Sequence, residues 1–365
     1  MLNFEVALII IIIEFMIIEY FFNCTNTKSL FNMKTSLTYL AFFLLSFFIS
    51  LGAFSQSFRS EEPFAHTFSV VAIDTTTGEM AVGVQSHWFS VGSIVSWAKS
   101  GVGVVATQSF VNPALGTDGL KLMGEGLPAD EVVNKLITDD KGRDFRQLAM
   151  LDKNGKIMAY TGSKCVQSAG HIIGNDYSVQ ANMMLNNKIV VAMAKTMETS
   201  RDIPLAERVV KAMQAAQDAG GDIRGKQSSV LLVVSTKPTP EWADKKINLR
   251  VDDHSEPLLE LERLLKVHRA YEHMNNGDLA IEHNDMALAL KEYAAAEQMF
   301  PENLEMKYWK AIALANNGNL EMALPIFKDI FSKDKNWLEM TKRLPASGLL
   351  NLSQPDLEKI YRQGI

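Results

Sequence analysis

Hydroxyl and imidazole side chains gather on two short alternating segments, residues 67–74 and 79–87. A Thr/Gly turn separates the segments, and this pattern predicts a β-hairpin. In a tight register Ser86 lies opposite Thr67, and His87 follows one position later. A strand that opens with a hydroxyl residue and carries further hydroxyls on the same face can supply a nucleophile. The alternative is a two-stranded edge of a β-sandwich that does no chemistry.

Amide side chains form a second set of candidates. Gln108 and Asn112 lie where a predicted strand turns into a predicted helix, so they can contact a carboxamide or complete an oxyanion pocket. Stabilisation of the turn by Asn112 is the alternative. Gln180 and Asn182 alternate on one face of an apolar stretch, and buried amides need partners. They are either oxyanion donors or structural residues.

The loop of residues 220–228 is the densest polar, glycine-flanked segment of the chain. Arg224 can bind a substrate carboxylate bidentately, or it can pair with Asp222 in a structural clamp. Gln227 is a further binding candidate in this loop. The loop lacks the GxxxxGK[ST] spacing, so a phosphate-binding loop is not indicated.

No motif in the sequence indicates a metal or a cofactor. Residues 252–254, Asp-Asp-His, are the one cluster of metal-ligand types, and three adjacent residues cannot all face one ion. We interpret them as a turn before a helix over residues 257–270. The sequence also lacks a GxSxG elbow and an SxxK motif, so the common serine-hydrolase classes have no support.

Hydrophobic periodicity predicts the elements that position these residues. Further strands are expected over residues 94–98, 101–109 and 229–235, and a second hairpin over 146–160. Helices are expected over residues 114–124, 128–138, 187–199 and 204–219, and a polar loop over 174–184. Strands, then helices, then strands favour an α+β fold over a parallel βαβ fold.

Five segments, in this order, resemble the uncharacterised family called domain of unknown function 1028. They are TFSVVAIDTTTGEMAVGVQS, GVGVVATQSFVNPALGTDGLKLM, AGHIIGNDYSVQANMM, AGGDIRGKQSSVLLVV and LRVDDHSEPLLELERLLKVH, and they span about residues 66–268. That family is grouped with the N-terminal-nucleophile (Ntn) hydrolases. The resemblance therefore implies a four-layer αββα sandwich and leaves the substrate open.

The resemblance also implies roles for the hairpin residues. Ntn hydrolases use the first residue of the mature chain as nucleophile and its α-amino group as base, and Thr67 stands at the matching place. Ser86 can then orient the amine, and His87 can act as base if the N-terminus stays blocked. Signal-peptide cleavage near Ser55 leaves about ten residues before Thr67, so a second cut, between His66 and Thr67, is required.

The composition excludes a nucleic-acid partner. The 365 residues are 47% hydrophobic and 21% charged, and the net charge is −6, which is ordinary for a globular protein. No Lys/Arg cluster is present. The two cysteines are Cys24 and Cys165, so loss of the leader leaves Cys165 without an intramolecular disulfide partner.

Residues 1–55 are predicted to be a leader. Residues 33–55 contain Lys34, then an apolar stretch, then a small-x-small site. This order is typical of a secretory signal peptide, which would start at Met33. The earlier apolar run, residues 6–18, has acidic flanks and indicates translated upstream sequence. We therefore expect an exported, periplasmic or secreted protein. Two transmembrane helices and a membrane-anchored protein are the alternative.

A 34-residue period marks the C-terminal part. Ala289 and Ala323 are 34 residues apart, as are Tyr293 and Phe327, and the spacing resembles tetratricopeptide repeats. Two such repeats are fewer than a separate solenoid needs, so we expect them to pack on the first domain or to form a homo-oligomer. A plain helical tail is the alternative. A groove in such repeats binds a peptide or protein partner.

The sequence thus predicts a leader over residues 1–55, an Ntn-hydrolase-like αββα domain over 64–250 and a helical tetratricopeptide-like region over 251–365. The first hypothesis is an exported amidohydrolase that cleaves a peptide or cell-wall-derived amide with Thr67 as nucleophile. The second is a non-catalytic αββα binding domain whose helical tail docks a protein partner.

Overall fold

The computed structural model describes residues 64–65 and 67–364. The predicted leader, residues 1–55, and His66 lie outside the described residues. Pro63–Ile365 cluster as one compact unit. Within the described part of the chain, no helix has the length and apolar character that crossing a membrane requires.

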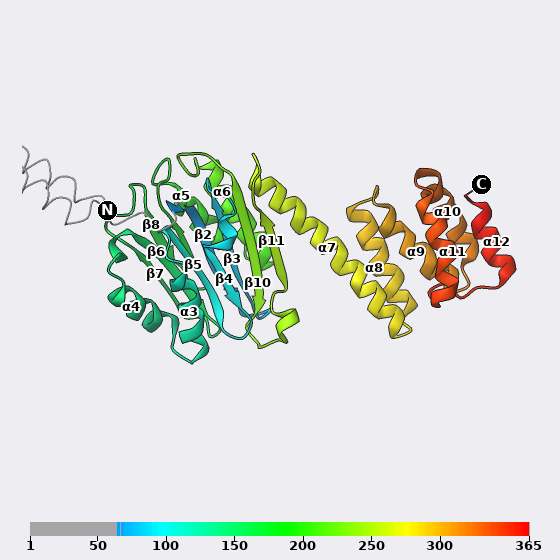
Figure 1. Cartoon of the computed structure of the whole chain (residues 1–365), viewed down its shortest axis with the longest axis horizontal. Coiled ribbons are helices and arrows are strands. Elements are labelled where there is room, and N and C mark those ends of the chain that lie inside the picture. Colours follow the sequence, from blue (N-terminus) through cyan, green and yellow to red (C-terminus); the bar gives the residue numbers. More distant parts are fainter. Residues whose placement is uncertain (1–63, 66, 365) are drawn as a thin grey trace, which may run out of the picture. The chain divides into compact units, whose positions relative to one another are not determined.

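The first part of the described chain is α+β and contains two antiparallel sheets (Figure 1). The six-stranded sheet has the order β11 (Ile247–Val251), β10 (Ser228–Ser235), β3 (Glu79–Ser86), β2 (Thr67–Asp74), β9 (Tyr177–Ala181) and β8 (Gly170–Ile173). The five-stranded sheet has the order β1 (Phe64–Ala65), β5 (Gly103–Phe110), β6 (Arg146–Asp152) and β7 (Ile157–Thr161), and β4 (Ser96–Lys99) also pairs with β5.

The predicted hairpin is confirmed, and its register is the expected one. Thr67 pairs with Ser86 and Asp74 pairs with Glu79. The hairpin does not form an edge, however, because β9 pairs with β2 on one side and β10 pairs with β3 on the other. The interpretation as an edge of a sandwich is therefore wrong. Every residue of the two strands except Asp74 is buried, as is typical of central strands in a sheet that is covered on both faces.

Three hydrophobic cores hold this part together. Alternate residues of β2 and β3, such as Val71 and Val82, pack against β5 and β6 between the two sheets. The opposite face of the six-stranded sheet packs against α5 (Ile189–Thr199) and α6 (Leu205–Asp218). The outer face of the five-stranded sheet packs against α3 (Ala114–Gly124) and α4 (Ala129–Asp139). At Gly83 of β3 a Cβ atom would lie 2.4 Å from Val209 of α6, so glycine lets helix and strand approach.

Several predicted elements need correction. The expected loop over residues 174–184 contains β9, a central strand, because tertiary partners satisfy the amides that made the segment look like a loop. The strand expected over residues 94–98 is present as β4, which begins two residues later and ends one residue later than predicted, and a 3-10 turn, Val91–Ser93, precedes it. Strands β8 and β11 were not predicted. The four helices predicted between residues 114 and 219 and the hairpin around Asn154-Gly155 are confirmed within about two residues.

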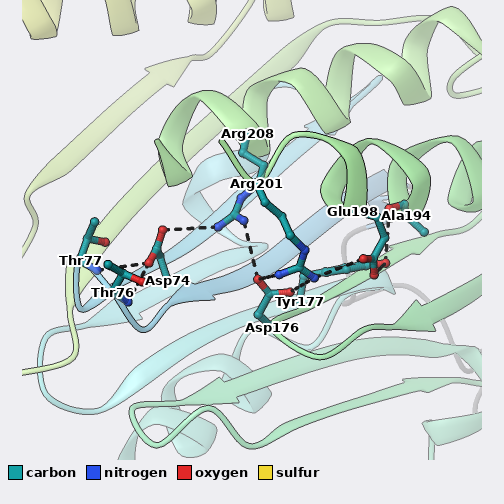
Figure 2. A network of polar contacts seen from close by, with 9 residues as sticks. All are labelled: Asp74, Thr76, Thr77, Asp176, Tyr177, Ala194, Glu198, Arg201 and Arg208. Atoms are coloured by element: carbon teal, nitrogen blue, oxygen red, sulfur yellow. Dashed lines mark hydrogen bonds and ion pairs between the residues drawn. The ribbon is translucent and has the colours of Figure 1, made fainter. Parts of the chain in front are cut away.

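A polar network fixes the hairpin at the end away from Thr67 (Figure 2). Arg208 of α6 is 3% exposed and lies 3.8 Å from Asp74 and 3.7 Å from Asp176. Asp176 also accepts two hydrogen bonds from Arg201, at 2.8 and 3.0 Å. One buried guanidinium thus joins the β2–β3 turn to the β8–β9 turn, and it holds both turns against α6.

The rest of the described chain is helical. It comprises α7 (Pro257–Glu282), α8 (Met286–Met299), α9 (Leu304–Asn316), α10 (Leu320–Lys333), α11 (Asn336–Arg343) and α12 (Gln354–Arg362). Helix α7 continues twelve residues beyond the predicted end at residue 270. Its first half packs Leu261 and Leu265 against the six-stranded sheet, and its second half packs Ala270 and Met274 into the core of the helical region.

The close packing of α7 on α8 depends on Gly277. A Cβ atom at this position would lie 2.5 Å from the ring of Tyr293. We expect Gly277→Ala to lower the free energy of unfolding by about 2 kcal/mol, because the overpacking outweighs the gain in helix propensity. Urea unfolding followed by circular dichroism measures the change. Asn276→Ala, at an exposed position of the same helix, is the control and leaves stability equal or higher.

Candidate active site

Thr67 stands at the point where the chain passes from one sheet to the other. Ala65 is the last residue of β1 in the five-stranded sheet, and Thr67 is the first residue of β2 in the six-stranded sheet. In the sequence, one residue lies between these two strands. Thr67 is fully buried, with Ser86 opposite it on β3.

The main chain of Thr67 is held by amide groups from both sheets. Its carbonyl oxygen accepts a hydrogen bond from the side chain of Gln108 at 3.1 Å. It accepts two more from Asn182, from the backbone N–H at 3.1 Å and from the side chain at 3.4 Å. Three donors on one carbonyl hold the start of β2 in place. Two of the predicted amide side chains, Gln108 and Asn182, therefore lie beside the predicted hairpin.

Gln147 of β6 lies behind these two amides. Its Oε1 accepts from Gln108 at 2.7 Å and from Asn182 at 2.9 Å. Its Nε2 lies 2.9 Å from the hydroxyl of Thr161 and 2.9 Å from the carbonyl of Ala181. Gln147 is fully buried, and after Gln108 of β5 it is the second amide that links the five-stranded sheet to the site.

A second row of hydrogen bonds extends along β9. The hydroxyl of Ser69 donates to Gln108 Oε1 at 2.7 Å and accepts from Gln180 Nε2 at 2.6 Å. Gln180 Oε1 in turn accepts from Ser178 at 2.9 Å. These buried groups satisfy one another, as buried polar groups must. Gln180 therefore positions Gln108 and does not itself contact Thr67 in the described contacts.

The loop of residues 220–228 approaches the other side of the hairpin. Asp222 accepts from the guanidinium of Arg224 at 3.0 and 2.7 Å, so the two form the clamp that was one of the alternatives. Asp222 Oδ2 also lies 3.3 Å from the backbone N–H of His87. His87 Nδ1 is buried and has no hydrogen-bond partner among the described residues. The clamp thus holds the end of β3 where His87 emerges.

Two predicted site residues have local roles. The side chain of Asn112 stabilises the turn before α3, where its Oδ1 accepts from the backbone N–H of Ala114 at 3.1 Å. Gln227 is half-buried, and its side chain donates to Asp253 at 3.1 Å, while its backbone N–H donates to Ser86 O at 3.0 Å. Neither side chain joins the network around Thr67 in the described contacts. Within the described residues, no group of three or more His, Cys, Asp or Glu side chains is placed to hold a metal ion.

A cavity of about 550 Å³ opens beside the network. Thr161, which bonds to Gln147, lies on its wall, and so does Cys165. The other described lining residues are Gly162, Ser163, Gln167, Ser168, Ala169 and Asn187. None of these side chains carries a formal charge, and burial raises the pKa of the Cys165 thiol, which stays protonated. The cavity is therefore polar and uncharged.

His171 of β8 completes the network, with Nδ1 2.8 Å from the hydroxyl of Thr161. Burial lowers the pKa of its imidazole, so it is neutral at pH 7. The unfolded chain takes up this proton near pH 6.5 and the folded chain only at lower pH. We therefore expect stability to fall as the pH drops below 6.5. Urea midpoints at pH 7 and pH 5 measure the loss, which is smaller in His171→Gln; an equal loss in both proteins would contradict this assignment.

Sequence reasoning missed Gln147, Thr161 and His171. Gln147 is a lone amide in the apolar strand RQLAMLD, which is the same signal that singled out Gln180. Thr161 and His171 gave no such signal, because an isolated hydroxyl or imidazole in a half-buried strand is common. Ser69 shared the predicted face of β2 with Thr67, and its partners lie on two other strands.

These features define an α+β protein with two antiparallel sheets, in which a buried network of amides and hydroxyls surrounds the start of a central strand. The chain belongs to the Family of unknown function (DUF1028), which matches residues 67–261. The matched segment begins at Thr67 and includes every residue of the network described above.

A solved structure supports this assignment. The crystal structure of protein SPO2555 from Silicibacter pomeroyi, also of the DUF1028 family, is similar with 28% sequence identity and a TM-score of 0.50. The similarity covers 55% of this chain and 88% of that chain. No curated protein matches the chain.

Proposed function

We propose that this protein is an exported Ntn-type amidohydrolase that cleaves an amide bond in a peptide or a cell-wall-derived amide. Thr67 is the nucleophile, and it becomes the first residue of the mature chain when the bond between His66 and Thr67 is cut. The site needs no cofactor under this proposal, because the α-amino group supplies the base.

The observation that carries the proposal is the environment of Thr67. It begins a central strand between the sheets, and three donors hold its carbonyl. A cut before Thr67 would therefore create an α-amino group on a residue that these hydrogen bonds already hold in position. Such an amine has a pKa near 8, so roughly a tenth of it is neutral at pH 7. That fraction can take the proton from the Thr67 hydroxyl.

The chemistry then proceeds in two steps. Thr67 Oγ1 bonds to the substrate carbonyl carbon, the amide C–N bond breaks, and the leaving nitrogen takes the proton held by the α-amine. Water then hydrolyses the ester on Oγ1 and releases the acid. Gln108 and Asn182 keep Thr67 in place through both steps. Ser86, opposite Thr67, is the residue suited to orient the amine, and His87 is the base if the amine stays blocked.

The packing supports an αββα arrangement. One core lies between the two sheets and one lies on the outer face of each sheet, under α5 and α6 or under α3 and α4. Gly277, Ala289 and Tyr293 pack at one helix pair, as the proposed tetratricopeptide-like repeat requires. The helical region is proposed as the docking site for a protein partner or a second copy of the chain.

A non-catalytic binding domain is the second candidate. The observation in its favour is that Thr67 is fully buried while Phe64 and Ala65 remain paired with β5. Under this proposal the preceding chain is never removed, and the helical region carries the function by docking its partner.

The mature N-terminus decides between the two. The full-length protein is expressed with its leader, and the secreted form is sequenced by Edman degradation or mass spectrometry. The hydrolase proposal expects a chain that starts at Thr67. A chain that starts near Gln56, with His66 still attached to Thr67, would contradict it and support the binding domain.

A further inference from the structure

We propose that β5 is the strand on which the substrate binds, in the position that Phe64 and Ala65 occupy. The substrate class is an extended peptide, or a peptide-like amide, with uncharged residues on the acyl side of the cleaved bond. This inference rests on the proposed hydrolase function and specifies its substrate.

The short strand β1 shows how a peptide fits at this place. Phe64 pairs with Phe110 and Ala65 pairs with Ser109, in the antiparallel direction. Strand β4 pairs with Gly103–Ala106 of β5, so β1 pairs with a part of β5 that β4 leaves uncovered. If the leader departs after the cut, the edge of β5 that pairs with β1 becomes available to another extended chain, and the Phe110 carbonyl keeps its hydrogen bond from Arg146.

The short spacing in sequence between β1 and Thr67 indicates where the cleaved amide bond of a substrate would lie. One residue separates Ala65 from Thr67, so the carbonyl of that residue is bonded directly to the nitrogen of Thr67. A substrate whose main chain follows β1 brings its own next carbonyl to the start of β2. There it meets Thr67 Oγ1, which is the attack that the proposed reaction requires.

The charged side chain that contacts this part of β5 already has a counter-ion: Arg146 of β6 donates to the carbonyl of Phe110 at 2.6 Å. Arg146, on the strand beside Ser109, is 2% exposed and pairs with Asp140 at 2.7 Å. The Cys165 thiol donates to the carbonyl of Arg146 at 3.3 Å, and it lines the uncharged cavity described above. A charged substrate side chain placed here would lose hydration without gaining a counter-ion. Hydroxyl, amide and apolar side chains meet no such cost.

Strand β5 has an uncommon backbone conformation at the same position. Ser109 has a φ of 76°, which is the left-handed region and is uncommon for a strand residue other than glycine. Such outliers persist where surrounding structure imposes them, often at ligand sites. The turn of the backbone at Ser109 lies directly opposite Ala65, so the strain coincides with the proposed substrate strand.

The experiment uses the secreted protein that starts at Thr67 and fluorogenic peptides copied from the leader. The reference peptide is acetyl-Pro-Phe-Ala-His coupled to aminomethylcoumarin, which reproduces residues 63–66. Two analogues carry an N-methyl group on the Phe or on the Ala nitrogen. Successive residues of an antiparallel pair alternate between bonded and non-bonded positions, so only one of the two N–H groups is needed.

We expect one N-methyl analogue to lose at least tenfold in kcat/KM and the other to stay within about twofold. We also expect Lys or Glu in place of the Ala to lower kcat/KM by tenfold or more relative to Ser. Equal effects of both N-methyl groups, or equal cleavage of the charged and uncharged peptides, would overturn the β5 assignment. If the protein starting at Thr67 cleaves other amides and none of these peptides, the substrate class is wrong and the hydrolase stands. If it cleaves no amide, both proposals fail.

Discussion

Thr67→Ala is expected to abolish amide hydrolysis, with turnover lowered by about 10³-fold or more, and to leave the fold intact. Alanine keeps the main-chain carbonyl to which Gln108 and Asn182 donate, and it lacks the hydroxyl oxygen that attacks the substrate. If the cut before Thr67 is autocatalytic, the variant also keeps its leader. Turnover of a fluorogenic amide and the mass of the secreted chain measure the two effects.

Thr67→Ser is the matched control for this substitution. Serine keeps a hydroxyl at the same place and is expected to retain measurable turnover and processing. Circular dichroism and urea unfolding show whether both variants fold as the unaltered protein does. Unchanged turnover in Thr67→Ala would contradict the assignment of the nucleophile, and His87, at the end of the neighbouring strand, would then be the next residue to replace.

Gln147→Leu is expected to lower the free energy of unfolding by about 3 kcal/mol. The substitution leaves one donor of Gln108 and one of Asn182 without their acceptor, and it leaves the carbonyl of Ala181 without this donor. Each buried polar group that loses its partner costs roughly 1–3 kcal/mol. Urea unfolding measures the change, and turnover is expected to fall with it because both donors to Thr67 lose their support.

Gln167→Leu provides the control, since Gln167 is exposed in the loop that lines the cavity. Its stability is expected to stay within about 0.5 kcal/mol of the unaltered protein. A loss at Gln147 no larger than the loss at Gln167 would show that the amide network does not hold the sheets together, and the proposed positioning of Thr67 would lose its basis.

Local patterns in the sequence were sufficient for the hairpin and for most helices. The alternation in residues 67–87 specified both the strands and the register, because a shift by one residue would turn every apolar side chain to the wrong face. The helix of residues 205–218 followed from its apolar period and from Gly220-Gly221 after it. The pairing of Asp222 with Arg224 could also be predicted from the sequence, since only one residue lies between them.

The site depended on contacts between distant segments, and no local pattern specifies these. Gln147 meets Asn182 across 35 positions, and Gln108 meets Ser69 across 39. Strand β9 resembled a polar loop because Gln180 and the following Asn182 have no partners until Ser69 of β2 and Gln147 of β6 approach them. Burying an amide without partners costs free energy, whereas a fully hydrogen-bonded network of buried amides is stable. The surroundings of an amide in the folded protein therefore decide its role. The sequence thus located the strand that Thr67 opens, while the packing of two sheets revealed what surrounds it.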